Sequence, residues 1–255
     1  MKKMKPMMGT VITIEIADPS AREADNDEVF AYFEQVEERF SVFKETSEIS
    51  RINSGEISPD DFSEEMREIF ILAEKTKEDT DGYFDIIAND GRYNPSGIVK
   101  GWSINNAAKI LRKKGYKNFY VDAGGDIEAS GKNAEGRPWS VGIKNPFDQF
   151  EIVKVVYLEK GGIATSGTYI RGQHIYNPFL RNNAITDIVS MSVIGPDIYE
   201  ADRFATAAFS MGRNGIMFIE KLPGFEGYMI DKDGLATYTT GFDKFTENRY
   251  VQDHR

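Results

Sequence analysis

Hydrophobic and polar positions along the chain follow two periods, one typical of strands and one typical of helices. In residues 11–16, isoleucines alternate with Val, Thr and Glu, which predicts a half-buried strand. In residues 26–43, apolar residues recur at spacings of three and four, which predicts an amphipathic helix. The helical pattern returns at residues 63–80, 104–114, 199–211 and 216–222. Further strands are predicted at residues 118–122, 127–130, 139–143, 152–158, 162–166, 188–194, 227–230 and 236–238.

These helices and strands are interspersed without strict alternation. Such an order favours the α+β class, with a mixed and largely antiparallel sheet flanked by helices. The sequence contains no internal repeat, no low-complexity tract and no linker rich in Pro, Gly or Ser. We therefore expect one domain that spans residues 1–255.

Charge and composition restrict the function. The 255 residues include 41 acidic and 31 basic side chains, so the formal net charge of −10 opposes binding to nucleic acid. The sequence has no cysteine, which excludes disulfides, thiolate nucleophiles and cysteine-ligated zinc. Its only histidines are His174 and His254. A metal ion would therefore be held mostly by oxygen ligands, which favours magnesium or calcium.

The start of the sequence is basic and passes directly into the first predicted strand. It lacks the apolar run of about 7–15 residues that a signal peptide needs. No stretch approaches the roughly 18 apolar residues of a membrane span. The expectation is a cytoplasmic protein without a membrane span, unless a leader precedes this sequence.

Five short stretches place small or polar residues where a plain hydrophobic core would not need them. They are residues 80–85, 94–101, 121–126, 163–178 and 200–209. None matches a Walker phosphate-binding loop, a dinucleotide-binding glycine fingerprint or a Gly-x-Ser-x-Gly nucleophile elbow. Each stretch also has a purely structural interpretation, such as a tight turn at Gly124-Gly125.

The stretch at residues 94–101 predicts a glycine-bearing loop that delivers Lys100 just before a helix. Such a loop could bind an anion, although an ordinary solvated lysine fits the same pattern. His174, which follows a run of small hydroxyl residues, could act as an acid or base, or could be a plain edge-strand residue.

Asp202 and Thr206 are four residues apart in a predicted helix. Their side chains would lie on one face, with Cβ atoms about 5–6 Å apart, and could share one hard cation. The alternative is that Asp202 caps the helix and Thr206 bonds back to the carbonyl of residue 202.

Taken in order, several of these motifs resemble the ApbE family of FAD:protein FMN transferases. The matching motifs are Met8-Gly-Thr10, residues 40–53, Gly82-Tyr-Phe-Asp85, Pro95-Ser-Gly-Ile-Val-Lys-Gly-Trp102, Asp122-Ala-Gly-Gly-Asp126, Ala164-Thr-Ser-Gly167, His174-Ile-Tyr-Asn-Pro178 and Ala201-Asp-Arg-Phe-Ala-Thr206. The resemblance implies an enzyme that binds FAD and Mg²⁺ and transfers FMN to a threonine or serine hydroxyl of an acceptor protein, with release of AMP.

The resemblance also implies roles for particular residues. FAD contacts would fall on Met8, Phe43, Tyr83, Phe84, Asp85, Asn94, Lys100 and Tyr176. The metal ligands would be the carbonyl of Gly97, the carboxylate of Asp202 and the hydroxyl of Thr206. His174 and Lys100 would act at the scissile phosphate.

The chain departs from the family pattern at two places. Asn94 and Asn177 stand where the family usually has aspartate, and Phe179-Leu-Arg181 replaces the usual x-Thr-Gly after Pro178. Two alternatives to the transferase therefore stay open. One is an FAD pyrophosphatase that releases FMN and AMP, and the other is a carrier that holds FAD without turnover.

Overall fold

The computed structural model describes residues 1–148, 150–168, 175–180 and 184–246. Its main feature is an eight-stranded sheet in the order β1-β2-β3-β4-β7-β8-β9-β10, in which every neighbouring pair is antiparallel. The strands are β1 (Lys2–Met7), β2 (Thr10–Ile16), β3 (Phe119–Ala123), β4 (Asp126–Ser130), β7 (Lys160–Gly167), β8 (Ile188–Gly195), β9 (Glu226–Asp231) and β10 (Ala236–Tyr238).

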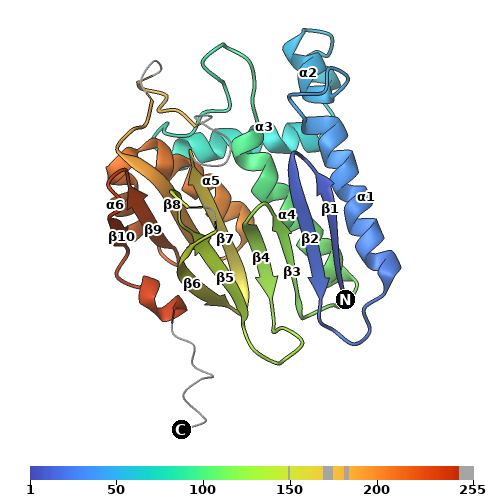
Figure 1. Cartoon of the computed structure of the whole chain (residues 1–255). Coiled ribbons are helices and arrows are strands. Elements are labelled where there is room, and N and C mark those ends of the chain that lie inside the picture. Colours follow the sequence, from blue (N-terminus) through green and yellow to red (C-terminus); the bar gives the residue numbers. More distant parts are fainter. Residues whose placement is uncertain (149, 169–174, 181–183, 247–255) are drawn as a thin grey trace.

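Helices cover one face of this sheet and one end of it (Figure 1). The face is covered by α1 (Glu23–Phe40), α4 (Ser96–Lys113), α5 (Ile198–Ser210) and α6 (Gly215–Glu220), whereas α2 (Glu48–Asn53) and α3 (Glu64–Asp79) lie beyond the ends of the strands. Short 3₁₀ turns lie at Pro59–Asp61, Gly212–Asn214 and Phe242–Phe245. The helices α4 and α5 lie behind the central strands, where Ile14, Val121 and Met191 of the sheet are fully buried against them.

A two-stranded hairpin lies on the opposite face of the sheet (Figure 1). Its strands β5 (Trp139–Lys144) and β6 (Ile152–Leu158) pair antiparallel. The inward side chains of this hairpin, including Val141 and Val156, form a second core with Ile163 and Ile194. The result is a layered arrangement of helices, sheet and hairpin, which confirms the predicted α+β class and its largely antiparallel sheet.

One helix begins earlier than the sequence pattern predicts. We expected a loop through residues 94–101 because of its glycines, but α4 starts at Ser96, so Lys100 is inside the helix. The glycines are there because α5 packs closely on α4: a Cβ on Gly101 would lie 2.6 Å from the Cβ of Asp202. Packing between helices therefore outweighs the low helix propensity of glycine.

Two elements escaped prediction altogether. The strand β1 has three lysines and a proline among its six residues, which is a composition suited to a sheet edge. The helix α2 has only six residues, too few for a clear period, and it is capped by Ser47, whose hydroxyl accepts the Ser50 N–H.

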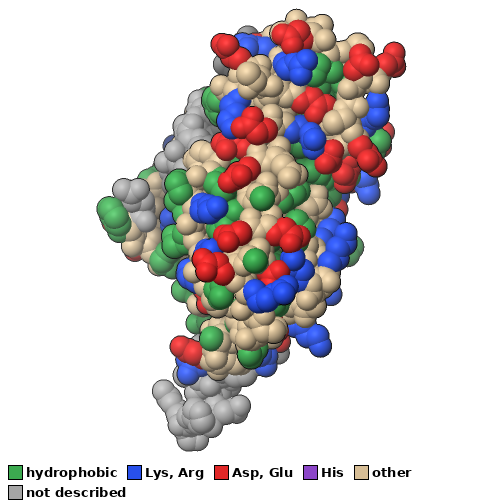
Figure 2. Space-filling model, turned by 90° about the vertical axis from the view of Figure 1, so that its right-hand side faces the viewer, with side chains coloured by type: hydrophobic (Ala, Val, Ile, Leu, Met, Phe, Trp, Pro, Cys, Tyr) green, Lys and Arg blue, Asp and Glu red, His purple; other side chains and the backbone are tan. Residues whose placement is uncertain are grey.

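Acidic and basic side chains alternate over the side of the molecule formed by β1 and α1 (Figure 2). Lys3 pairs with Glu23 and Asp27 on this side, at 2.6 and 2.8 Å. In the part of the chain that the structure describes, no helix is long and apolar enough to cross a membrane.

Candidate active site

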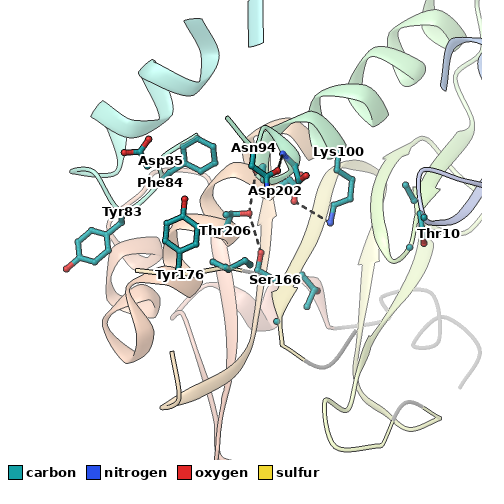
Figure 3. Close-up of a pocket in the computed structure, with 18 of the residues that line it drawn as sticks. Thr10, Tyr83, Phe84, Asp85, Asn94, Lys100, Ser166, Tyr176, Asp202 and Thr206 are labelled. Carbon is teal, nitrogen blue, oxygen red and sulfur yellow. Dashed lines mark hydrogen bonds and ion pairs between the residues drawn. The ribbon is translucent and has the colours of Figure 1, made fainter. Parts of the chain in front are cut away.

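A polar cavity opens where the β1–β2 turn, the loop before α4 and the end of β7 meet (Figure 3). Its lining residues are Gly9, Thr10, Tyr83, Phe84, Asp85, Asn94, Ser96, Gly97, Lys100, Ala123, Gly124, Thr165, Ser166, Gly167, Ile175, Tyr176, Pro178, Asp202 and Thr206. They place aromatic rings, a lysine and several oxygen-bearing side chains around one opening.

The back of the cavity is formed by the close crossing of α4 and α5. Gly97 and Gly101 are one helical turn apart on α4, and each faces one polar side chain of α5. A Cβ on Gly97 would lie 3.2 Å from Cγ2 of Thr206, and Gly101 abuts Asp202 in the same way. The two polar side chains predicted to share one helix face are therefore both brought to the α4 backbone.

Oxygen atoms from three sequence-distant segments gather at this crossing. The Thr206 hydroxyl donates to the Gly97 carbonyl in a long contact of 3.5 Å and lies 3.4 Å from the Ser166 hydroxyl (Figure 3). Oδ2 of Asp202 accepts the Gly101 N–H at 2.7 Å. The Gly97 carbonyl oxygen has two lone pairs, so it can accept a hydrogen bond and still have capacity for a ligand.

The alternative interpretation, in which Asp202 caps its helix, is wrong. The cap of α5 is Asp197, whose side chain accepts the Glu200 N–H at 3.0 Å. Asp202 instead lies within the helix and is nearly fully buried.

The donor set at the crossing suits a hard cation. A backbone carbonyl, a carboxylate and a hydroxyl are all oxygen ligands, which Mg²⁺ and Ca²⁺ prefer. Within the described residues, no group of three or more His, Asp or Glu side chains could hold a metal by itself. A cation here would take its remaining ligands from water or from the oxygens of a bound substrate, as Mg²⁺ usually does beside phosphates.

A buried charge cluster lies beside these oxygens. The ammonium of Lys100 contacts the carboxylate of Asp126 and lies 3.7 Å from Oδ1 of Asp202. Both carboxylates are almost completely buried, and the Lys100 side chain is 24% exposed. Lys100 thus presents its charge at the cavity wall.

The loop after α3 supplies an aromatic and acidic wall. Phe84 is buried against Gly97, while Tyr83 is partly exposed and packs edge-on against Phe179, with ring centroids 5.0 Å apart. Asp85 is held by Lys77 of α3 at 2.9 Å and accepts the Ile87 N–H at 2.9 Å. This wall offers flat surfaces and one fixed carboxylate to a ligand.

Asn94 and Tyr176 complete this wall. Oδ1 of Asn94 accepts the Ser96 N–H at 3.1 Å, so this side chain stabilises the first turn of α4. The Tyr176 hydroxyl donates to the Ile87 carbonyl at 2.6 Å, which ties the segment after residue 174 to the loop after α3.

Burial changes the acid strength of one carboxyl group close to the cavity. Asp122 stands at the end of β3, beside the cavity-lining Ala123, and its carboxylate accepts the Gly125 N–H at 2.7 Å. Desolvation by burial raises the pKa of Asp122 above its usual range.

Two predicted site residues that the structure describes are not among the cavity-lining residues. Phe43 is 94% exposed and lines a second depression, which adjoins the cavity through Asn94. Met8 precedes the lining residue Gly9, and its own N–H donates to Glu37 at 3.2 Å. His174 lies outside the described residues, so its role stays a prediction.

Several residues in the cavity or directly behind its wall were not predicted as site residues. Thr10 follows the turn after Met8, and its hydroxyl packs so closely on Gly124 that a Cβ there would lie 2.5 Å away. Ser166 and Asp126 belong to stretches that the sequence singled out, but nothing in their local pattern linked them to Thr206 and Lys100. Those links come only from the pairing of β4 with β7 and from the position of α5.

Comparison with known proteins agrees with the motifs. The profile of the ApbE family matches residues 8–92 and 88–229. The chain therefore belongs to the ApbE family.

Curated relatives agree with this membership. FAD:protein FMN transferase of Escherichia coli (strain K12) is 30% identical over 148 residues, which cover 54% of this chain and 42% of that protein. The protein of the same name from Vibrio cholerae is 31% identical over 156 residues, which cover 57% of this chain and 47% of the relative. The matched stretch thus spans less than half the length of these curated relatives.

The fold extends the similarity to nearly the whole chain. The crystal structure of the ApbE protein from Thermotoga maritima superposes with a TM-score of 0.84 at 21% identity, and covers 97% of this chain and 99% of that chain. The flavin transferase ApbE from Vibrio cholerae gives a TM-score of 0.83 at 23% identity, with coverage of 96% and 98%.

Proposed function

We propose that this protein is a magnesium-dependent flavin transferase that moves FMN from FAD to a threonine or serine hydroxyl of an acceptor protein and releases AMP. The observation that carries the proposal is the meeting of the Gly97 carbonyl, Asp202 and Thr206 next to Lys100. Their oxygens suit Mg²⁺ together with water or substrate oxygens, and the adjoining ammonium suits a pyrophosphate. The names of the relatives support the same activity.

Binding of FAD would use the two kinds of surface that the cavity offers. Tyr83 and Tyr176 present rings against which a flat heterocycle can stack. The ammonium of Lys100 would bind the pyrophosphate oxygens as a point charge. Phe43, in the adjoining depression, extends the aromatic surface beyond Asn94.

The transfer step forms one bond and breaks one bond. The acceptor hydroxyl oxygen would attack the FMN phosphorus, a new phosphoester bond would form, and the pyrophosphate bond to AMP would break. His174 would take the proton from the attacking hydroxyl. Bound Mg²⁺ would offset negative charge on the pyrophosphate and on the leaving AMP.

Lys100 would assist the same step. Because its ammonium is already fixed at the cavity wall, it would offset the negative charge that grows on the leaving phosphate oxygens. Asp126 and Asp202 hold that ammonium at the cavity wall.

A product assay separates this function from its alternatives. The protein is incubated with FAD and Mg²⁺, with and without a purified candidate acceptor domain, while AMP, free FMN and the acceptor mass are followed. Formation of AMP with an acceptor that gains one FMN group supports transfer. Free FMN in the absence of acceptor identifies a pyrophosphatase, and intact bound FAD identifies a carrier.

A further inference from the structure

The ammonium of Lys100 lies between two carboxylates of different roles. Asp202 belongs to the proposed metal site, whereas Asp126 does not line the cavity. Of the two, Asp126 is the closer partner, since the Asp202 oxygen is 3.7 Å away. The lysine is therefore drawn to the side of the carboxylate that takes no part in the proposed metal site.

Asp126 is fixed from behind by the sheet. It begins β4, its side chain is 2% exposed, and its Oδ1 accepts the Thr165 N–H of β7 at 2.9 Å. That bond leaves Oδ2 directed at the lysine. A buried carboxylate held in this way gives the ammonium one preferred position.

The charges of the cluster favour a second cation. Two carboxylates and one ammonium leave the three groups with one net negative charge in a buried place. Without the charge of Asp126, Lys100 and Asp202 would form a neutral ion pair. The ammonium would then compete with a metal ion for the Asp202 carboxylate. Coulomb interactions over about 4 Å are strong away from bulk water, so this exchange of partners has a large effect on cation binding.

We propose that Asp126 is a positioning residue that holds the Lys100 ammonium away from Asp202 and so permits a divalent cation to bind Asp202. This inference rests on the metal site of the proposed function. It predicts that the loss of Asp126 is harmful only while Lys100 is present.

The test measures binding of Mn²⁺, a probe that also prefers oxygen ligands, to the nucleotide-free full chain by electron paramagnetic resonance. Asp126→Asn should weaken Mn²⁺ binding by about tenfold or more. The double variant Asp126→Asn/Lys100→Met should recover the affinity of the wild type, because it removes the competing ammonium and restores the net negative charge. A merely structural role of Asp126 gives the opposite pattern, with the double variant as weak as the single one or weaker.

Two controls make the result interpretable. Asp122→Asn removes one charge from the same β3–β4 turn and should change Mn²⁺ affinity by less than about threefold, since that carboxylate bonds to Gly125 instead. Thermal melting shows whether each variant is folded, and recovery by the double variant itself demonstrates a folded site.

The outcomes separate the two claims. If Asp202→Ala binds Mn²⁺ as the wild type does, the metal assignment of the proposed function fails, and this inference fails with it. If Asp202→Ala loses binding but Asp126→Asn keeps the wild-type affinity, only the role of Asp126 is overturned.

Discussion

The backbone N–H of Gly101 donates a buried hydrogen bond of 2.7 Å to Oδ2 of Asp202. This bond joins α4 to α5 and fixes the carboxylate that we place in the metal site. It exists because residue 101 has no side chain: a Cβ there would lie 2.8 Å from the Ile198 carbonyl oxygen and closer still to Asp202. The glycine that disfavours a helix in the sequence is thus what allows two helices to form the site.

Gly101→Ala should therefore damage both stability and function. Alanine improves helix propensity by up to about 1 kcal/mol, but the added methyl group has no space, and such overpacking costs about 1–3 kcal/mol. We expect a net loss of about 1–2 kcal/mol in the free energy of unfolding by urea, with a reduced response of AMP release to Mg²⁺. Lys109→Ala, on the exposed side of α4, should stay within about 0.5 kcal/mol of the wild type. Equal stability of all three proteins would contradict this account of the helix crossing.

The hydroxyl of Thr206 has a different role from its methyl group. The methyl packs toward Gly97, whereas the hydroxyl faces the Gly97 carbonyl and Ser166. Thr206→Val keeps the shape and removes the oxygen, so we expect the Mg²⁺ concentration for half-maximal AMP release to rise about tenfold or more. Thr206→Ser keeps the oxygen and should remain near the wild type. An unchanged Mg²⁺ requirement in Thr206→Val would remove this residue from the metal site.

Asp25 on α1 makes stability depend on pH. It accepts hydrogen bonds from Arg22 and Tyr116 and pairs with Lys114, and these partners hold the pKa of its carboxyl well below the usual range. A lowered pKa in the folded state stabilises the protein above the unfolded value of about 3.9, and this contribution is lost as the pH falls below that value. Urea unfolding between about pH 5 and pH 2.5, a window that spans this value, should show a steeper loss of stability in the wild type than in Asp25→Asn.

A matched variant makes the pH experiment specific. Glu34→Gln removes a carboxylate from the exposed face of the same helix and should follow the wild-type slope. Parallel curves for the wild type and Asp25→Asn would show that the cluster around Asp25 does not control stability in acid.

Much of the fold could be predicted because its periodic elements are long. The helices α1, α3 and α5 and most sheet strands have clear patterns, and all are found near their predicted positions. The edge strand β1 and the six-residue α2 are too polar or too short for a pattern. The early start of α4 depends on contact with α5, which no local pattern contains.

The same holds for the site: contacts within one helix could be predicted from the sequence, and contacts between distant elements could not. Asp202 and Thr206 share one helix, so their spacing alone predicted that they lie together. The partnership of Lys100 with Asp126 joins α4 to β4, and it arises only when the sheet and helices pack. Phe43 was predicted by resemblance; it lines a neighbouring depression and not the main cavity, so its contact with FAD stays a prediction.

The most direct test of the proposed function is the intact mass of an acceptor domain after incubation with FAD, Mg²⁺ and this protein. We expect the acceptor to gain one FMN group in the presence of Mg²⁺, to stay unmodified when Mg²⁺ is chelated, and to stay unmodified with the Asp202→Ala variant. An acceptor modified equally by the wild type and by Asp202→Ala would contradict the central role of the α4–α5 crossing. An acceptor that stays unmodified while free FMN and AMP accumulate would show that the protein is a hydrolase.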